Sequence, residues 1–309
     1  MKKTLIASAV AAATLSTSAF AMDNSQAEKI LGMFDSMPKI SGDIEIFGSY
    51  TDSNGASGNT DGIMDDVDST VAISHETAIS EETTAYVNAE FIYNSTVSGS
   101  GLGSDTTVLG FKGGFGDVSL GTQDSVYEAV DIIDFSENLG GVVAGDLLGA
   151  AEDQTINYTT PTIGEGITLS ASMQTDEDVD NIGSLALAYS ADDLTVNFGY
   201  GMNDVNEDVI GISAAMTMDD LTISAQFETQ DETGDIMGVL ATYAMGVNTL
   251  NFAIINQAPD GGDDVIGISG NVIHNLADNV YVYVEASFQS SDNDAAEMDQ
   301  YVVGTTYSF

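Results

Sequence analysis

The sequence predicts an all-β fold, a transmembrane antiparallel β-barrel of sixteen strands whose chain is exported from the cytoplasm. Three observations lead to this prediction: an export signal at the N-terminus, an apolar–polar alternation of period two that continues to the last residue, and a regular exchange of long and short connecting segments. Apart from the export signal, no apolar run approaches about 20 residues, so membrane-spanning helices are not expected.

The first 21 residues have the three parts of a secretory signal peptide. Lys2 and Lys3 form a basic start, an apolar stretch follows, and Ala19-Phe20-Ala21 gives the A-x-A pattern before the cleavage site. We therefore expect residues 1–21 to be removed. Residues 22–41 form an N-terminal segment, in which 23–36 could be a short amphipathic helix or a periplasmic plug, and the barrel is expected over 42–309.

The composition is strongly acidic, with 49 Asp and Glu residues, five Lys, no Arg and a formal net charge of −44. This excludes nucleic acid as a partner, because phosphate binding needs Lys and Arg. It favours cations and cationic solutes. An acidic surface adapted to a salty habitat would give the same composition, and the two interpretations stay open. The chain has no Cys, so disulfides play no part.

The alternation defines the strands. In 280–288, for example, Val280, Val282 and Val284 lie on one face, and Tyr281, Tyr283 and Glu285 on the other. Such segments have about the length that a tilted strand needs to cross a bilayer. Sixteen are predicted: 42–52, 68–78, 82–94, 105–113, 117–122, 153–160, 166–175, 182–190, 193–201, 207–217, 220–229, 234–243, 246–256, 263–274, 279–289 and 299–309.

The connectors alternate in length. Longer connectors such as 53–67, 95–104 and 123–152 alternate along the chain with short ones such as 114–116 and 191–192. Long outer loops and tight periplasmic turns are typical of outer-membrane barrels, and an even number of strands returns both termini to the periplasmic side. A soluble all-β protein would also alternate, but the export signal and the consistently polar second face favour the barrel.

The last strand ends in DQYVVGTTYSF. Tyr301, Val303, Tyr307 and Phe309 fall on one face, and a terminal Phe in this pattern resembles the assembly signal of Gram-negative outer-membrane barrels. We expect this strand to close onto the first one, since an open edge in lipid would leave backbone groups unpaired.

Three stretches resemble the general porin family of Gram-negative bacteria: IEIFGSY at 44–50, LGFKGGFGDVSLGTQDSVYEAV at 109–130 and DQTINYTTP at 153–161. The resemblance implies a homotrimer of 16-stranded barrels with a long third loop, 123–152, constricting each pore. It implies passive diffusion of small hydrophilic solutes and ions across the outer membrane, assembly in lipid by the barrel assembly machinery, and neither enzymatic activity nor a cofactor.

The sequence departs from that family where the pore should be narrowest. Ser49, Thr122 and Ala151 stand where the family often has basic residues. Acids are expected to line the pore instead and to give a preference for cations. The candidates are Glu45, Glu76 and Glu90 on the first three strands, and Asp124, Glu128, Asp131, Asp134, Glu137 and Asp146 on the third loop.

Other residues carry weaker signals. Lys112 is expected near a short turn at the periplasmic rim, and His75 and His274 are expected to pack in the wall. The Asp-rich loops do not fit the EF-hand spacing, so no metal site is predicted. A sugar-selective porin with Tyr86, Tyr281 and Tyr283 in its lumen, and a structural or adhesive surface barrel, are alternative functions. An enzyme is not expected, because no catalytic motif surrounds either His.

Overall fold

The structure is a computed structural model that describes residues 37–54, 60–66, 69–140, 147–148, 153–175, 182–203, 207–292 and 296–309. The expected signal peptide at 1–21 and the expected helix within 23–36 lie outside these residues. Among the residues described, no helix is long and apolar enough to cross a membrane.

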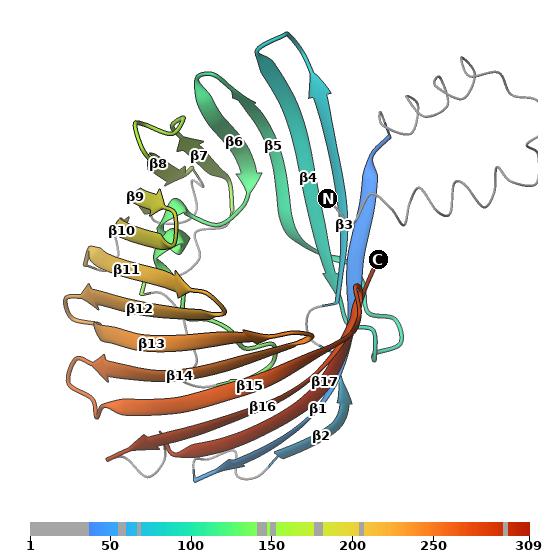
Figure 1. Ribbon diagram of the computed structural model, residues 1–309, viewed down its shortest axis with the longest axis vertical. Coiled ribbons are helices and arrows are strands. Elements are labelled where there is room, and N and C mark those ends of the chain that lie inside the picture. Colours follow the sequence, from blue (N-terminus) through green and yellow to red (C-terminus); the bar gives the residue numbers. More distant parts are fainter. Residues whose placement is uncertain are drawn as a thin grey trace, which may run out of the picture.

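The described chain folds into one large antiparallel sheet whose strands follow each other in sequence order (Figure 1). A single short 3-10 helix, η1, lies inside it in the described part of the chain. The elements are β1 Lys39–Ser53, β2 Thr60–Asp65, β3 Ser69–Ala78, β4 Thr83–Tyr93, β5 Gly103–Gly113, β6 Gly116–Thr122, η1 Val126–Val130, β7 Thr155–Thr159, β8 Ile167–Gln174, β9 Ile182–Ala191, β10 Leu194–Asn203, β11 Val209–Met218, β12 Leu221–Gln230, β13 Gly234–Met245, β14 Asn248–Pro259, β15 Val265–Ala277, β16 Val280–Ser291 and β17 Met298–Ser308.

The sheet closes on itself, as the sequence predicts. β1 pairs with β17 from Asp43↔Ser308 to Ser53↔Met298. Two more hydrogen bonds complete this junction, because Gly42 N donates to Phe309 O at 3.1 Å and Phe309 N donates to Gly42 O at 2.9 Å. No open edge remains at this junction, which is what a barrel in lipid requires.

The second strand of the ring is longer than predicted and is interrupted. β3 pairs with the first part of β1 and β2 pairs with its second part. β2 and β3 therefore occupy one place in the ring, and the closed barrel has 16 strands. The prediction of an irregular loop over 53–67 is wrong for 60–65, because these residues find backbone partners on β1. β1 itself begins at Lys39, earlier than the expected residue 42.

The predicted faces are those that the barrel uses. On β11, Ile210 and Ile212 point outward and are 45% and 49% exposed, whereas Ser213 points inward and is buried. An apolar outer band with a polar inner face is what a barrel surrounded by lipid requires. The predicted terminal residues Tyr301, Val303, Tyr307 and Phe309 all belong to the exposed apolar surface.

The turns at one end are tight, in agreement with the alternation of connector lengths. β9 and β10 are joined by Asp192-Asp193, and β11 and β12 by Asp219-Asp220. Asp192 and Asp219 have φ angles of 43° and 53°, a left-handed conformation that Asp tolerates better than most residues. We call this end of the barrel the short-turn end.

Candidate functional site

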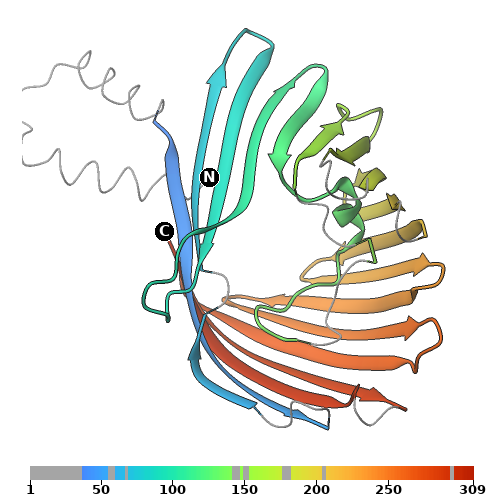
Figure 2. The same ribbon diagram turned by 180° about the vertical axis from the view of Figure 1, so that it is seen from behind.

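The segment between β6 and β7, residues 123–154, is called loop three. The part of loop three that the structure describes runs inside the barrel, and η1 lies along the inner wall of β8–β11 (Figure 1, Figure 2). Residues 123–140, 147–148 and 153–154 of this loop are described. The expected pore residue Asp146 lies outside them.

Loop three begins with η1, which packs against the wall through glycines. Ser125 caps the helix, since its hydroxyl accepts from Tyr127 N at 3.2 Å. Tyr127 and Val130 are completely buried. They press on Gly199 of β10 and Gly211 of β11, where an added Cβ would come within 2.8 Å of them or closer. These two positions must lack a side chain for the helix to reach the wall.

Glu228 of β12 holds this part of loop three by accepting hydrogen bonds. Its Oε2 accepts from the hydroxyl of Tyr127 at 2.7 Å and from Leu147 N at 3.1 Å. Its Oε1 accepts from Gln226 Nε2 at 2.7 Å. Glu228 is fully buried, and a buried carboxylate is tolerated only when donors surround it.

The middle of loop three is held by apolar packing. Ile133 is fully buried and packs with Ile236 and Leu240 of β13 and Ile255 of β14. Gly238 leaves the space, because an added Cβ there would lie 2.5 Å from Ile133 Cδ1. This patch of the inner face is therefore apolar, like the two smaller clusters around Val209 and around Phe47 and Val302.

A second wall carboxylate, Glu285 of β16, holds the next part. Its two oxygens accept from Glu137 N and Asn138 N, both at 2.9 Å. Asn271 Nδ2 donates to Glu285 Oε1 at 3.0 Å and to Phe135 O at 3.1 Å. The backbone of loop three is thus fixed to the wall by acids and amides, without any basic side chain.

Glu45 points inward as expected, but loop three covers it. It is 7% exposed. Its Oε1 accepts from the Tyr283 hydroxyl at 2.5 Å, from Asn138 Nδ2 at 3.0 Å and from Thr306 Oγ1 at 3.4 Å. Glu45 therefore helps to anchor loop three.

Glu137 is half-buried and accepts a hydrogen bond from the Tyr281 hydroxyl at 2.8 Å. Burial raises the pKa of Glu137, the hydrogen bond from Tyr281 lowers it, and the negative charges of Glu285, Asp43 and Asp134 raise it further, so that the net shift is upward. Of the other predicted acids of loop three, Asp124 and Asp134 are exposed, and Glu128 and Asp131 are half-buried.

Glu90 lies on β4, away from the strands β8–β11 on which η1 packs. The charges of Asp43 and Asp105 both act on Glu90, and the charge of Asp43 also acts on Glu137. A bulge between β4 and β5 places Asp105 beside Glu90, and Asp43 Oδ1 accepts from Thr70 Oγ1 at 2.5 Å. The acidic group Asp43, Glu90, Asp105 and Glu137 is the candidate site.

The sequence prediction included Glu90 and Glu137 but omitted Asp43 and Asp105. Asp43 precedes Glu45 by two residues and shares its inward face, which was a usable signal. Asp105 reaches the group through a bulge, and alternation does not indicate bulges. Glu228 and Glu285 were also omitted as anchors, although each interrupts an otherwise uncharged inward face.

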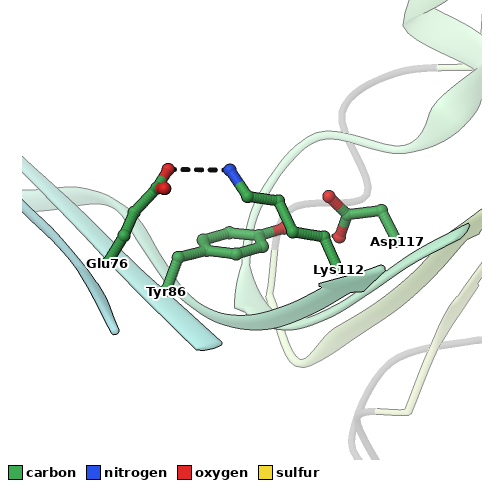
Figure 3. Close-up of polar contacts among 4 residues, drawn as sticks. All are labelled: Glu76, Tyr86, Lys112 and Asp117. Carbon is green, nitrogen blue, oxygen red and sulfur yellow. Dashed lines mark hydrogen bonds and ion pairs between the residues drawn. The ribbon is translucent and has the colours of Figure 1, made fainter. Parts of the chain in front are cut away.

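Glu76 lies apart from this group. It is near the short-turn end, where its Oε1 lies 2.7 Å from Lys112 Nζ (Figure 3). Lys112 thus has the position near a short turn that the sequence predicts. Lys39 and Lys112 are the only basic residues apart from His in the described ranges. Within those ranges no group of three or more His, Asp or Glu residues is arranged to hold a metal ion.

Comparisons with known proteins agree with this architecture. A family profile described as Gram-negative porin matches residues 7–296. A monosaccharide porin of Halomonas sp. and the major outer membrane protein of Halomonas elongata are each 25% identical over an alignment of 378 residues that covers 100% of both chains.

Solved structures share the fold at low sequence identity. The anion-selective porin from Comamonas acidovorans has a TM-score of 0.73 and 14% identity, covering 88% of this chain and 99% of that one. The trimer form of OmpT from Vibrio cholerae has a TM-score of 0.69 and 17% identity, with the same two coverages.

Proposed function

Because this chain belongs to the Gram-negative porin family, whose members are channel proteins rather than enzymes, we propose that it forms a water-filled pore that prefers small cations. The barrel lies in the outer membrane as a multi-pass protein. In this proposal small hydrophilic solutes and ions diffuse passively between loop three and the wall of β1 and β3–β6.

The acidic group carries the proposal. Asp43, Glu90 and Asp105 come from the wall, Glu137 comes from loop three, and Asp43 acts electrostatically on both sides. Carboxylates that face one another across a pore concentrate cations and exclude anions. Among the described residues, Lys39 and Lys112 supply the only non-histidine positive charges, and Lys112 is engaged by Glu76.

The fold by itself does not decide the ion preference. The Comamonas acidovorans structure has the same architecture and is named anion-selective. Selectivity in this fold must therefore depend on the side chains of the lining. The absence of Arg from the sequence and the acidic group support a preference opposite to that of the Comamonas acidovorans protein.

The test is the reversal potential of single channels in a planar bilayer under a salt gradient. We expect a cation-selective reversal potential for the natural protein and a clear loss of selectivity in the variant Asp43→Asn/Glu90→Gln/Asp105→Asn. The control variant, Asp192→Asn/Asp193→Asn/Asp219→Asn, removes the same number of charges from short turns. An anion-selective natural channel, or equal effects of the two triple variants, would contradict the proposal.

The trimer and the processed N-terminus belong to the same proposal. OmpT of Vibrio cholerae has been solved in a trimer form, which supports a homotrimer here. Cleavage after Ala21 would leave Met22 as the first residue of the mature chain. N-terminal sequencing and light scattering of protein extracted from outer membranes test the two points separately.

A sugar-selective pore is the second candidate, because one relative is named a monosaccharide porin. The three tyrosines that would stack on sugars are buried or already make contacts within the protein. Tyr283 is 1% exposed, the Tyr281 hydroxyl is bound to Glu137, and the Tyr86 ring lies over Gly110. The test is uptake into liposomes. Saturable uptake of monosaccharides, without saturable uptake of other uncharged solutes of equal size, would favour this candidate over the general pore.

A further inference from the structure

Four charged or polar side chains on neighbouring strands form a cluster at the short-turn end of the barrel, and we call it the mouth cluster. It consists of Glu76 on β3, Tyr86 on β4, Lys112 on β5 and Asp117 on β6 (Figure 3). The side chains of Lys112 and Glu76 are 43% and 60% exposed, so both are in contact with water inside the barrel.

Two contacts of the mouth cluster run in opposite directions across the strands, one from Lys112 to Glu76 and one from Tyr86 to Asp117. Lys112 lies directly opposite Asp117 in the strand register, yet its ammonium points away from Asp117 toward Glu76, two strands away, at 2.7 Å (Figure 3). On the way it passes the ring of Tyr86, with Nζ 5.4 Å from the ring centroid. The hydroxyl of Tyr86 meanwhile donates to Asp117 Oδ1 at 2.7 Å.

Glycine makes this crossing possible. Tyr86 lies opposite Gly110 of β5, and an added Cβ on Gly110 would come within 2.1 Å of the ring. The ring can therefore lie across β5 and reach β6. Asp117 thus has the neutral hydroxyl of Tyr86 as its donor. The ammonium of Lys112, the single positive charge of the cluster, pairs with Glu76, on which the charge of Lys39 also acts.

We propose that Lys112 is a further selectivity residue, which lowers the negative charge of the short-turn mouth and so limits the cation preference of the pore. An exposed ion pair contributes little to stability. A fixed charge at the mouth of a passage with low-dielectric walls nevertheless changes the local concentration of ions. The proposal rests on the proposed function, since it assumes that ions pass this mouth.

The absence of Cys from the chain permits a test on functioning channels. Lys112→Cys channels are inserted into a bilayer and then treated with thiol reagents that add a positive, a neutral or a negative group. We expect the cation-to-anion permeability ratio to rise in that order, because a more negative mouth holds a higher local concentration of cations, and we expect the positive reagent to restore the natural value. The current before treatment shows that the variant is folded.

Gly114→Cys is the matched control. Gly114 lies in the turn beside the cluster, and an added Cβ there meets nothing within 4 Å. Charge added at Gly114 should change the permeability ratio much less. Modification of the Lys112→Cys thiol without a graded change, or an equal change in the Gly114→Cys channel, would overturn the role of Lys112. An anion-selective natural channel with a graded response in Lys112→Cys would instead contradict only the proposed function.

Discussion

The hydroxyl of Tyr283 on β16 donates to Glu45 Oε1 on β1 at 2.5 Å by crossing Gly304 of β17, which lies between the two strands. Tyr86 reaches Asp117 across Gly110 in the same way, and Tyr127 of loop three reaches Glu228 across Gly211. In a chain without Arg, tyrosine hydroxyls thus supply donors to inward carboxylates.

This arrangement predicts that Gly304 is needed for its lack of a side chain. In Gly304→Ala the new Cβ would lie 2.2 Å from the ring and hydroxyl of Tyr283. We expect a loss of about 1–3 kcal/mol of stability, as is usual for an overpacked site. The measurement is the heat-induced loss of the folded band in electrophoresis. Gly101→Ala, where a Cβ meets nothing within 4 Å, should leave the transition unchanged, and equal behaviour of the two variants would refute the crossing.

The anchor at Glu285 predicts how firmly loop three is held. In Glu285→Gln one of the two oxygens that accept from Glu137 N and Asn138 N becomes an amide nitrogen, so one backbone donor loses its acceptor. The cost of an unsatisfied buried donor, about 1–3 kcal/mol, corresponds to a roughly tenfold to hundredfold loss of hydrogen-exchange protection. Amide exchange at 137–138 measures this change. The exposed turn variant Glu165→Gln should exchange like the natural protein, and unchanged protection in Glu285→Gln would exclude the anchor.

The raised pKa of Glu137 predicts that the ion selectivity of the channel depends on pH. Because its pKa is raised above the ordinary value of 4.5, the folded protein favours its protonated form. Glu137 therefore gains a proton, as the pH falls, before exposed glutamates do. As the pH falls, the cation preference should begin to decrease near the raised pKa of Glu137, before the pH reaches the ordinary value. In Glu137→Gln this early decrease should be absent. Reversal potentials measured across a pH series test this prediction, and the exposed Asp153→Asn variant should keep the profile of the natural protein.

Alternation predicted the strands and their faces well, because one side of every strand must be apolar in lipid whatever the lumen contains. It also placed Glu45, Glu76 and Glu90 on the inner side. It did not indicate that Glu45 is covered, since the cover is Asn138, distant in the sequence. The inward apolar residues Ile236 and Ile255 were a signal that part of the inner wall is packed against loop three.

β2 was missed for a different reason. Its pairing with β1 ends at Asp65, and the ring strand is interrupted there before β3 resumes at Ser69. Local composition in this stretch is rich in Asp and Gly, which is typical of turns rather than strands. The partner strand, and not the local sequence, decides the conformation of 60–65.

Asp66 holds this interruption together and gives the last prediction. Its Oδ1 accepts from Ser69 N at 3.0 Å and its Oδ2 accepts from the Ser69 hydroxyl at 2.7 Å and from Ser95 N. The Ser69 hydroxyl oxygen in turn accepts from Glu45 N at 3.0 Å. Burial raises the pKa of Asp66, but the hydrogen bonds from Ser95 and Ser69 lower it by more, so the net pKa is below the ordinary 3.8.

The stabilising contribution of Asp66 is therefore fully present above pH 3.8 and is lost as the pH falls through the lowered pKa. In Asp66→Asn we expect about 1–3 kcal/mol less stability at neutral pH, and a difference that shrinks in strong acid. Thermal unfolding of both proteins over a pH series measures it, with the exposed Asp153→Asn as control. A difference that stays constant down to strong acid would show that the charge of Asp66 does not hold the junction between β2, β3 and the segment after β4.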